Sequence, residues 1–211
     1  LLKGNAKLYE EDRIATGDKI DYYGGETDKV IIDGKARFED KENIATGNKI
    51  YYYDDEPPVI ILEGDAELKT HNNNSDRIVK AEKIYYYAGD LKKALLMGNP
   101  IVKEKNQTAK GDMIEYYDSE TESKAAIIGN AYLEDIDNNN KKRIITADMI
   151  DYKGGGENKP NNFMLHGSVR IEEGERITTA NKGEYYSIPL ENKNDSDSKI
   201  ILEGNVKTVE K

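Results

Sequence analysis

The chain has 211 residues, of which 34% are charged and 36% hydrophobic, and its formal net charge is −10. Nucleic-acid-binding proteins normally present a basic face, because phosphate neutralisation supplies most of their affinity, so this acidic composition excludes that class. The absence of cysteine excludes disulfides, thiol catalysis and cysteine-ligated metals, and no segment approaches the roughly 20 apolar residues that span a bilayer.

The sequence is built from a repeat, and each copy has a glycine near the end of an apolar stretch. Repetition at a period of 30–38 residues indicates stacked units that bury their apolar faces against one another. We therefore predict a single domain over residues 1–211 with about six repeats, and residues 1–4 resemble the end of an interrupted copy, which predicts a preceding segment. The glycines that mark the copies are Gly4, Gly34, Gly64, Gly98, Gly129, Gly167 and, for a last partial copy, Gly204.

The first limb of each repeat runs through this glycine, and residues 30–38 are its clearest copy. Apolar side chains stand at positions 30, 32, 36 and 38, and charged ones at 33, 35 and 37. This period-two alternation is typical of a β-strand with one buried face. Gly34 falls on the inward side, where the missing side chain predicts a sharp bend or a close approach of neighbouring strands.

The second limb of each repeat carries a small residue at its middle and ends in an Ile-x-Tyr motif. In residues 14–23, Gly17 is the small residue and is followed by an acidic side chain. Ala15 and Gly17 share a parity that Ile20 does not, so we predict a one-residue phase slip at Asp18, where a bulge or corner resets the inward face. Other copies of this limb occupy residues 44–53, 78–87, 144–153 and 177–186.

Together the two limbs predict an all-β fold. Out-and-back limbs with a bend at their middle form antiparallel hairpins whose halves lie in different sheets, which gives an elongated, solenoid-like clamp of two facing antiparallel sheets. The inward positions are the candidate lining of this clamp: Ile20, Val30, Ile32, Ala36, Phe38, Ile50, Ile60, Leu62, Ala66, Leu68, Ile84, Leu96, Val102, Ile114, Ile127, Leu133, Ile150, Leu165, Val169, Ile171, Ile200, Leu202 and Val206.

The motifs Gly-Asn-Ala-x-Leu, Ala-x-Gly-Asp-Lys-Ile-x-Tyr and Lys-Val-Ile-x-x-Gly resemble the OstA-like repeat. That repeat occurs in the bacterial lipopolysaccharide-transport proteins LptA, LptC (periplasmic part) and LptD (N-terminal domain), and the resemblance covers residues 4–209. It implies an open β-jellyroll in the periplasm of a Gram-negative-type bacterium, where association with the outer membrane is a further expectation. In such a protein the candidate lining shields lipopolysaccharide acyl chains without catalysis or cofactors. It also implies that exposed edge strands stack on other Lpt-type β-jellyroll proteins or on further copies of the chain.

Two other functions compete with this interpretation. The first is a structural or adhesive β-solenoid whose apolar stripe packs as a closed core and admits no lipid. The second is a polysaccharide-active enzyme, which would need clustered charged side chains that break the repeat, and the sequence has none. Tyr23, Tyr53 and Tyr87 lie off the inward parity, and we interpret them as cross-strand packing.

The sequence predicts no metal site. His71 and His166 have no partner at a spacing that binds metals. The Asp- and Asn-rich residues 135–140 and 195–197 lack the glycine and terminal glutamate of an EF-hand loop, so we interpret them as ordinary insertion loops. No cluster of lysine and arginine is recognisable near the predicted mouth of the clamp.

Overall fold

The computed structural model describes residues 1–10, 12–25, 28–72, 75–88, 92–118, 123–136, 140–154, 161–188 and 197–210. All regular structure in these residues is β-strand, which confirms the predicted fold class. The predicted loops at 135–140 and 195–197 lie partly outside the described residues. The chain divides into two compact units, Leu1–Lys105 and Asn106–Lys211, here called the N-terminal and C-terminal units. The single domain over the whole chain stays a prediction.

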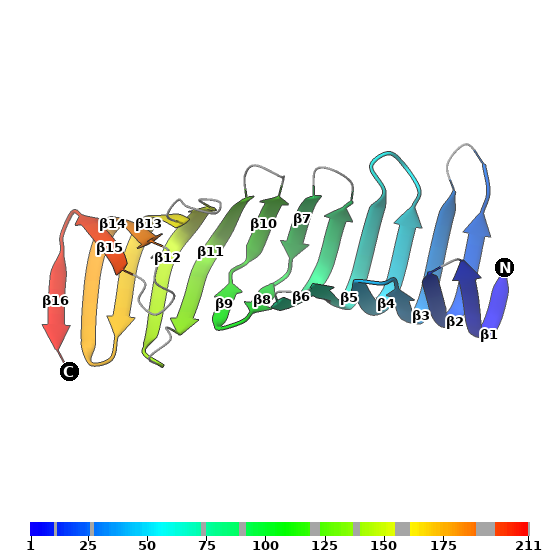
Figure 1. Cartoon of the computed structure of the whole chain (residues 1–211), viewed down its shortest axis with the longest axis horizontal. Coiled ribbons are helices and arrows are strands. Elements are labelled where there is room, and N and C mark those ends of the chain that lie inside the picture. The colour runs from blue at the N-terminus through cyan, green and yellow to red at the C-terminus, as the bar shows by residue number, and fades with distance from the viewer. Residues whose placement is uncertain are drawn as a thin grey trace. The chain divides into compact units, whose positions relative to one another are not determined.

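The N-terminal unit is a run of antiparallel strands in which each strand from β1 to β6 pairs with the next along the chain (Figure 1). At its end, β6 pairs with two short strands, β7 along one half of its length and β8 along the other. The strands are β1 (Leu2–Glu10), β2 (Arg13–Tyr23), β3 (Lys29–Glu39), β4 (Asn43–Tyr53), β5 (Val59–Asn72), β6 (Ser75–Tyr87), β7 (Lys92–Met97) and β8 (Ile101–Glu104).

The C-terminal unit has the same organisation. Its first long strand, β11, pairs along one half with β10 and along the other with β9, and its last long strand, β14, pairs in the same way with β15 and β16. The strands are β9 (Gln107–Lys110), β10 (Met113–Asp118), β11 (Ser123–Ile136), β12 (Lys142–Lys153), β13 (Asn161–Glu173), β14 (Arg176–Ile188), β15 (Asp197–Glu203) and β16 (Lys207–Glu210).

A β-bulge divides each long strand into two halves. Between β3 and β4 the register runs from Asp33 opposite Lys49 to Ala36 opposite Gly47, so two residues of β3 face one residue of β4. In β2 the buried residues are 15, 17 and 20, which breaks strict alternation at the expected place. The predicted phase slip is therefore confirmed.

The repeat glycine provides the backbone conformation of the bulge. Gly34 has φ of +74°, in the left-handed region where a side chain is disfavoured. The carboxylate of Asp18 lies directly over it, because a Cβ added at Gly34 would stand 2.4 Å from Asp18 Oδ2. The Asp, Asn or Glu that follows the small residue of one strand thus packs on the glycine of the next. The predicted bend at the glycine is confirmed.

The halves of the strands form two half-sheets in each unit. The first half-sheet contains the Ile-x-Tyr ends of the strands, and the second contains the ends that carry Ala15 and its equivalents. In the N-terminal unit they face each other, because the rings of Phe38 and Tyr52 stack with centroids 5.7 Å apart. Phe38 is paired with Ala45, seven residues before Tyr52 in β4, a span of about 23 Å in a straight strand. The strand must therefore fold back at the bulge.

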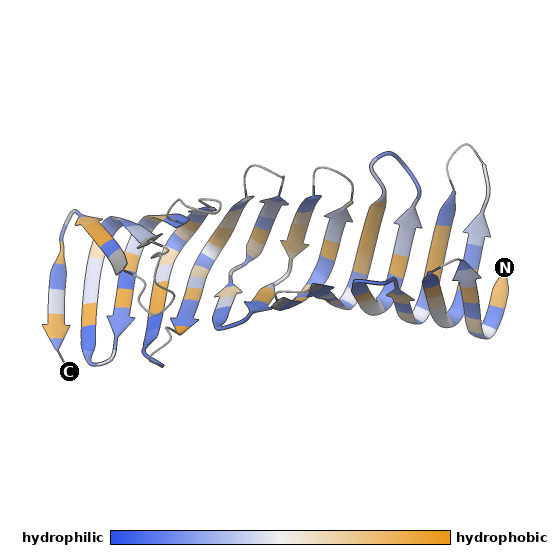
Figure 2. Ribbon diagram, viewed as in Figure 1, coloured by the Kyte–Doolittle hydropathy of each residue, from blue (hydrophilic) through white to orange (hydrophobic). Residues whose placement is uncertain are grey.

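Bands of apolar and polar residues alternate along the strands of each unit (Figure 2). The apolar bands on the facing sides of the two half-sheets form the core. Pro100, which cannot donate to a strand ladder, lies between β7 and β8 at the equivalent of the bulge, as expected for a proline at a bend.

Candidate functional site

The interior between the half-sheets is filled by the predicted lining. In the N-terminal unit, Ile20, Ile32, Ile50, Leu62 and Ile84 from the first half-sheet are at most 1% exposed. Most of the other predicted positions are also buried: Ala36, Phe38, Ala66, Leu96, Ile114, Ile127, Leu133, Ile150, Leu165, Val169 and Ile171. Six are half-buried: Val30, Ile60, Leu68, Val102, Ile200 and Leu202.

Val206 is the exception among the predicted lining, because half of its side chain is exposed (50%). It stands two residues after Gly204, the bulge glycine of the last partial copy, and lies outside the regular strands, between β15 and β16. The alternating pattern predicted that Val206 would be buried. Its side chain stays exposed because no later strand of the described residues packs against it.

The small residue of the second limb makes room for the large side chains of the lining. A Cβ added at Gly17 would lie 2.6 Å from Ile32 Cγ2, and one at Gly111 would lie 2.7 Å from Ile127 Cγ2. Contacts this short do not occur between real atoms, so the isoleucine of the next strand occupies the space that the glycine leaves. This packing explains why the position before Asp18 and its equivalents is small.

An arginine and a tyrosine from opposite half-sheets meet at the mouth of the N-terminal unit, which is the open edge where the strands end, opposite the bulges. Arg13 begins β2 in the second half-sheet, and Tyr52 stands near the end of β4 in the first. Arg13 Nη1 donates to the Tyr52 hydroxyl at 3.2 Å, and its guanidinium lies 5.6 Å from the ring centroid. The hydroxyl in turn donates to Asp54 Oδ1 at 2.8 Å. Burial, with the hydrogen bond to Asp54, raises the pKa of Tyr52 to about 12.

The C-terminal unit repeats this arrangement with Arg143 and Tyr185. Arg143 lies opposite Glu173 in the second half-sheet, and Tyr185 lies opposite Phe163 in the first. Arg143 Nη1 donates to the Tyr185 hydroxyl at 2.6 Å with the guanidinium 4.8 Å from the ring centroid, and its Nε donates to Glu173. The Tyr185 ring continues a ladder through Phe163 to Tyr152, with centroids 5.3 and 5.0 Å apart.

These mouth arginines were missed by the sequence reasoning, although the signal is present. The residue before the first apolar position of the second limb is arginine at four copies: Arg13, Arg77, Arg143 and Arg176. The arginines stand far apart in the sequence and form no run, so a search for local clusters of charge does not detect them. When the copies of the repeat are aligned with one another, the four arginines fall at the same position of the second limb.

A cavity of about 370 Å³ opens beside β14, β15 and β16 in the C-terminal unit. Four aliphatic side chains and two threonines line it, together with two arginines and one glutamate, a formal charge of +1 in a chain of −10. Arg176 is paired through its backbone with Glu173 and Glu210, but its side chain forms no hydrogen bond or ion pair with another described residue. The lining consists of Arg143, Ile171, Glu173, Arg176, Thr178, Ile200, Leu202, Val206 and Thr208.

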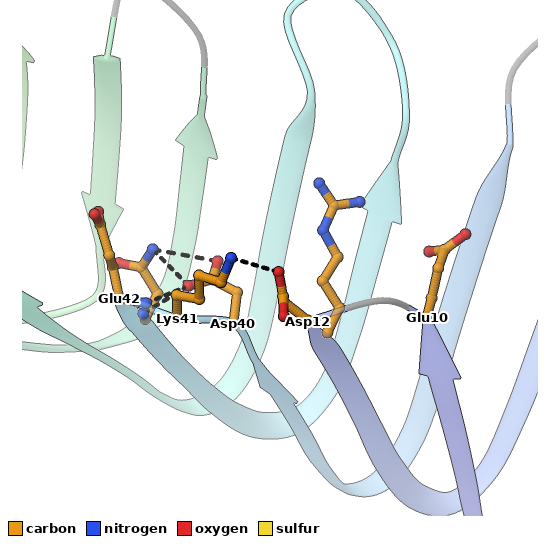
Figure 3. A pocket seen from close by; sticks show the side chains of 7 residues that line it. Glu10, Asp12, Asp40, Lys41 and Glu42 are labelled. Carbon is orange, nitrogen blue, oxygen red and sulfur yellow. Dashed lines mark hydrogen bonds and ion pairs between the residues drawn. The ribbon is translucent and has the colours of Figure 1, made fainter.

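A second cavity, of about 510 Å³, lies between the β1–β2 and β3–β4 turns and is polar (Figure 3). Lys41 Nζ contacts Asp12 Oδ2 at 2.5 Å across it. Asp40 organises the second turn by accepting hydrogen bonds from the backbone N–H groups of residues 42 and 43 at 2.9 and 2.7 Å. Its lining is Glu10, Asp12, Arg13, Asp40, Lys41, Glu42 and Asn43, a formal charge of −2 without an apolar side chain, so it cannot solvate an acyl chain.

The outward tyrosines pack under lysines. Lys29 Nζ lies 4.8 Å from the centroid of the Tyr53 ring, within cation–π range. His71 and His166 each contact a single aspartate, at 2.9 and 3.0 Å. Within the residues described by the structure, no three His, Cys, Asp or Glu side chains form a group that could hold a metal ion.

Residues 1–58 match the family model described as LptA/(LptD N-terminal domain) LPS transport protein. The predicted resemblance to the OstA-like family is confirmed over these residues. The matched segment contains β1 to β4, and the OstA-like pattern of glycine bulge and Ile-x-Tyr limb continues through the later strands. No curated protein matches the chain. Among the described residues there is no helix of the length and hydropathy needed to cross a membrane.

Proposed function

We propose that this protein is a non-enzymatic component of lipopolysaccharide transport in the periplasm of a Gram-negative-type bacterium, and that it shields acyl chains between its half-sheets. The family match supports the pathway. The observation that carries the proposal is the cavity in the C-terminal unit, where the aliphatic lining becomes accessible beside two arginines. An amphiphile with acyl chains and an anionic headgroup fits both parts of that lining.

The energetic basis of the proposal is the hydrophobic effect. Each methylene of an acyl chain that leaves water gains about 0.8 kcal/mol. Ile200 and Leu202 are half-buried, so an acyl chain in the cavity would cover apolar surface that water now contacts. The sugar portion of the lipid would stay outside, in contact with the acidic and hydrated surface.

Site-specific photo-crosslinking tests this proposal. A photoreactive residue at Leu202 should crosslink lipopolysaccharide in cells, whereas the same residue at Ile201, which points to the opposite face of β15, should not. Leu62 and Ile61 form the corresponding pair in the N-terminal unit. Equal labelling at the members of both pairs, or no labelling at Leu62 and Leu202 in a folded protein, would contradict the proposal.

A structural or adhesive solenoid is the second candidate function. The observation in its favour is the filled interior of the N-terminal unit, where the first half-sheet's isoleucines and leucine have almost no exposed surface. A dry core of this kind needs no ligand. Mass spectrometry of the intact protein purified without detergent distinguishes the two functions, because a shielding protein should carry bound lipid and a closed solenoid should not.

We further propose that the protein stacks end to end on Lpt-type β-jellyrolls or on its own copies. Within the described residues, β1 pairs with β2 alone and β16 with β14 alone. Val209 in β16 and Leu2 in β1 are exposed, and exposed strands are templates for β-augmentation. Sedimentation of the Val209→Lys variant should show weaker self-association than the wild type, and Met97→Lys, which changes an exposed residue away from these strands, is the control. Equal association of the two variants would contradict stacking through β16.

A further inference from the structure

The pairs Arg13–Tyr52 and Arg143–Tyr185, one in each unit, have matching geometry. In both, an arginine at the start of a second limb contacts the tyrosine near the end of another second limb, on the opposite half-sheet. The tyrosine is 39 residues further along the chain in the first pair and 42 residues in the second. In both, the guanidinium donates to the tyrosine hydroxyl and also lies within 6 Å of the ring centroid. We call each pair a clasp.

Each clasp is placed where it can hold the half-sheets together. The bulge joins the half-sheets along one side, so they can separate only at the side where the strands end. Arg13 is the first residue of β2 and Tyr52 is the last but one of β4. The hydrogen bond between them therefore spans the mouth far from the bulge. At this distance from the joined edge, one bond resists the separation of the two half-sheets most effectively.

The clasp tyrosines are buried although their hydroxyls lie at the mouth. Tyr52 is 8% exposed and Tyr185 is 4% exposed. Hydrogen bonds to charged groups contribute more to stability than hydrogen bonds between neutral groups, and the guanidinium adds attraction to the face of the ring. Closing the clasp thus covers the apolar lining of its unit.

We propose that the two clasps control access to the interior, so that each unit admits an acyl chain only when its arginine and tyrosine separate. This inference rests on the proposed lipid-shielding function for the identity of what enters. The closing action itself depends only on the two pairs. Arg143 also lines the cavity in the C-terminal unit, so that clasp stands where an anionic amphiphile in the cavity would meet the closed interior.

Tyr52→Phe and Tyr185→Phe test the clasps because they remove one oxygen and keep the ring that packs on Phe38 or Phe163. Tyr53→Phe is the matched control in the N-terminal unit, since it makes the same change on the outer face of the same strand. Tyr186→Phe is the control in the C-terminal unit, because its hydroxyl bonds Glu184 two residues away.

Distances across the mouth are measured by electron paramagnetic resonance between spin labels on introduced cysteines. The chain has no cysteine of its own, so each pair of labels is unique. Glu42→Cys and Asp55→Cys stand at the two ends of β4 in the N-terminal unit. Lys153→Cys and Glu175→Cys stand on opposite half-sheets of the C-terminal unit. All four positions are exposed.

Loss of the hydrogen bond should lower the ratio of closed to open forms about ten- to hundred-fold. We expect Tyr52→Phe to add a longer-distance population in the N-terminal unit only, and Tyr185→Phe in the C-terminal unit only. The controls should match the wild type. Arg13→Met should reproduce the effect of Tyr52→Phe. Distance distributions in Tyr52→Phe and Tyr185→Phe that equal those of their controls would overturn the proposal.

The uptake of cis-parinaric acid, a fluorescent fatty acid, measures access independently. Faster uptake in the clasp variants than in their controls supports control of access, and equal uptake rates overturn it. If the distances widen as expected but neither wild type nor variant binds this probe or lipopolysaccharide, the clasps are confirmed as closing devices and the lipid-shielding function is refuted. The two failures are therefore distinguishable.

Discussion

The bulge glycines offer a sharp test of how the fold is held, and Gly64→Ala is the most informative change. Gly64 has φ of +72°, and a Cβ added there would stand 2.4 Å from Asn48 Nδ2 and 3.0 Å from Asn48 Cβ. A residue with a side chain in the left-handed region costs about 1–2 kcal/mol. The Asn48 side chain is exposed, but its Cβ cannot move without the backbone, so relieving the clash forces the side chain away from its preferred rotamer at a cost of about 1 kcal/mol.

We therefore expect Gly64→Ala to lower the free energy of unfolding by about 2–3 kcal/mol. In a chain of this length each kcal/mol shifts Tm by about 2–4 °C, so the midpoint should fall by about 4–12 °C. Urea denaturation followed by far-ultraviolet circular dichroism gives the free energy, and a thermal scan gives Tm.

Two other glycines separate the contributions. Gly4 has φ of +73° with no atom within 4 Å of an added Cβ, so Gly4→Ala should show the backbone cost alone. Gly24 has neither a positive φ nor a contact shorter than 3.4 Å, so Gly24→Ala should leave stability unchanged. The expected order of destabilisation is Gly64, then Gly4, then Gly24. A Gly64→Ala protein within about 0.5 kcal/mol of the wild type would refute the reasoning.

Further predictions follow from the bulges, the lining and the tyrosines. Lys35 has φ of 48°, so Lys35→Gly should raise the free energy of unfolding by about 1 kcal/mol in the same urea assay. Ile50→Ala should destabilise by about 2–5 kcal/mol because Ile50 is fully buried, whereas Ile44→Ala, on the outward face of the same strand, should cost less than half as much. The pKa values of Tyr52 and Tyr132 are raised to about 12, so the unfolded chain loses these protons first and stability should fall as pH rises from about 10 to about 12. Tyr52→Phe should make that fall shallower in urea titrations at each pH, and an unchanged slope would contradict the assignment.

Much of the fold could be predicted from local patterns. The alternation in residues 30–38 defines an inward face because side chains of a strand point to opposite sides at a period of two. The parity change between Gly17 and Ile20 located the bulge for the same reason. These signals lie within ten residues of chain, where the backbone geometry alone relates the side chains.

The environment of the lining was harder to predict. Ala36 and Val206 each stand two residues after the repeat glycine of their copy, yet Ala36 is 1% exposed and Val206 is 50% exposed. The difference depends on whether a further strand and the opposite half-sheet cover the position, and neither is encoded in the segment itself. The cavity beside Leu202 has the same origin.

The contacts at the corner and the mouth were decided by tertiary structure. Asp18 covers Gly34, and Arg13 meets Tyr52, only because neighbouring strands pair in one register and each strand folds at its bulge. A register shifted by one residue would turn every one of these side chains to the other face. The sequence by itself determined the repeat, the all-β class and the inward stripe, since these follow from periodicity along one strand. The closing of one half-sheet over the other, with the arginine–tyrosine clasps at its mouth, was decided by the fold, because it depends on the angle at the bulge and on residues about 40 positions apart.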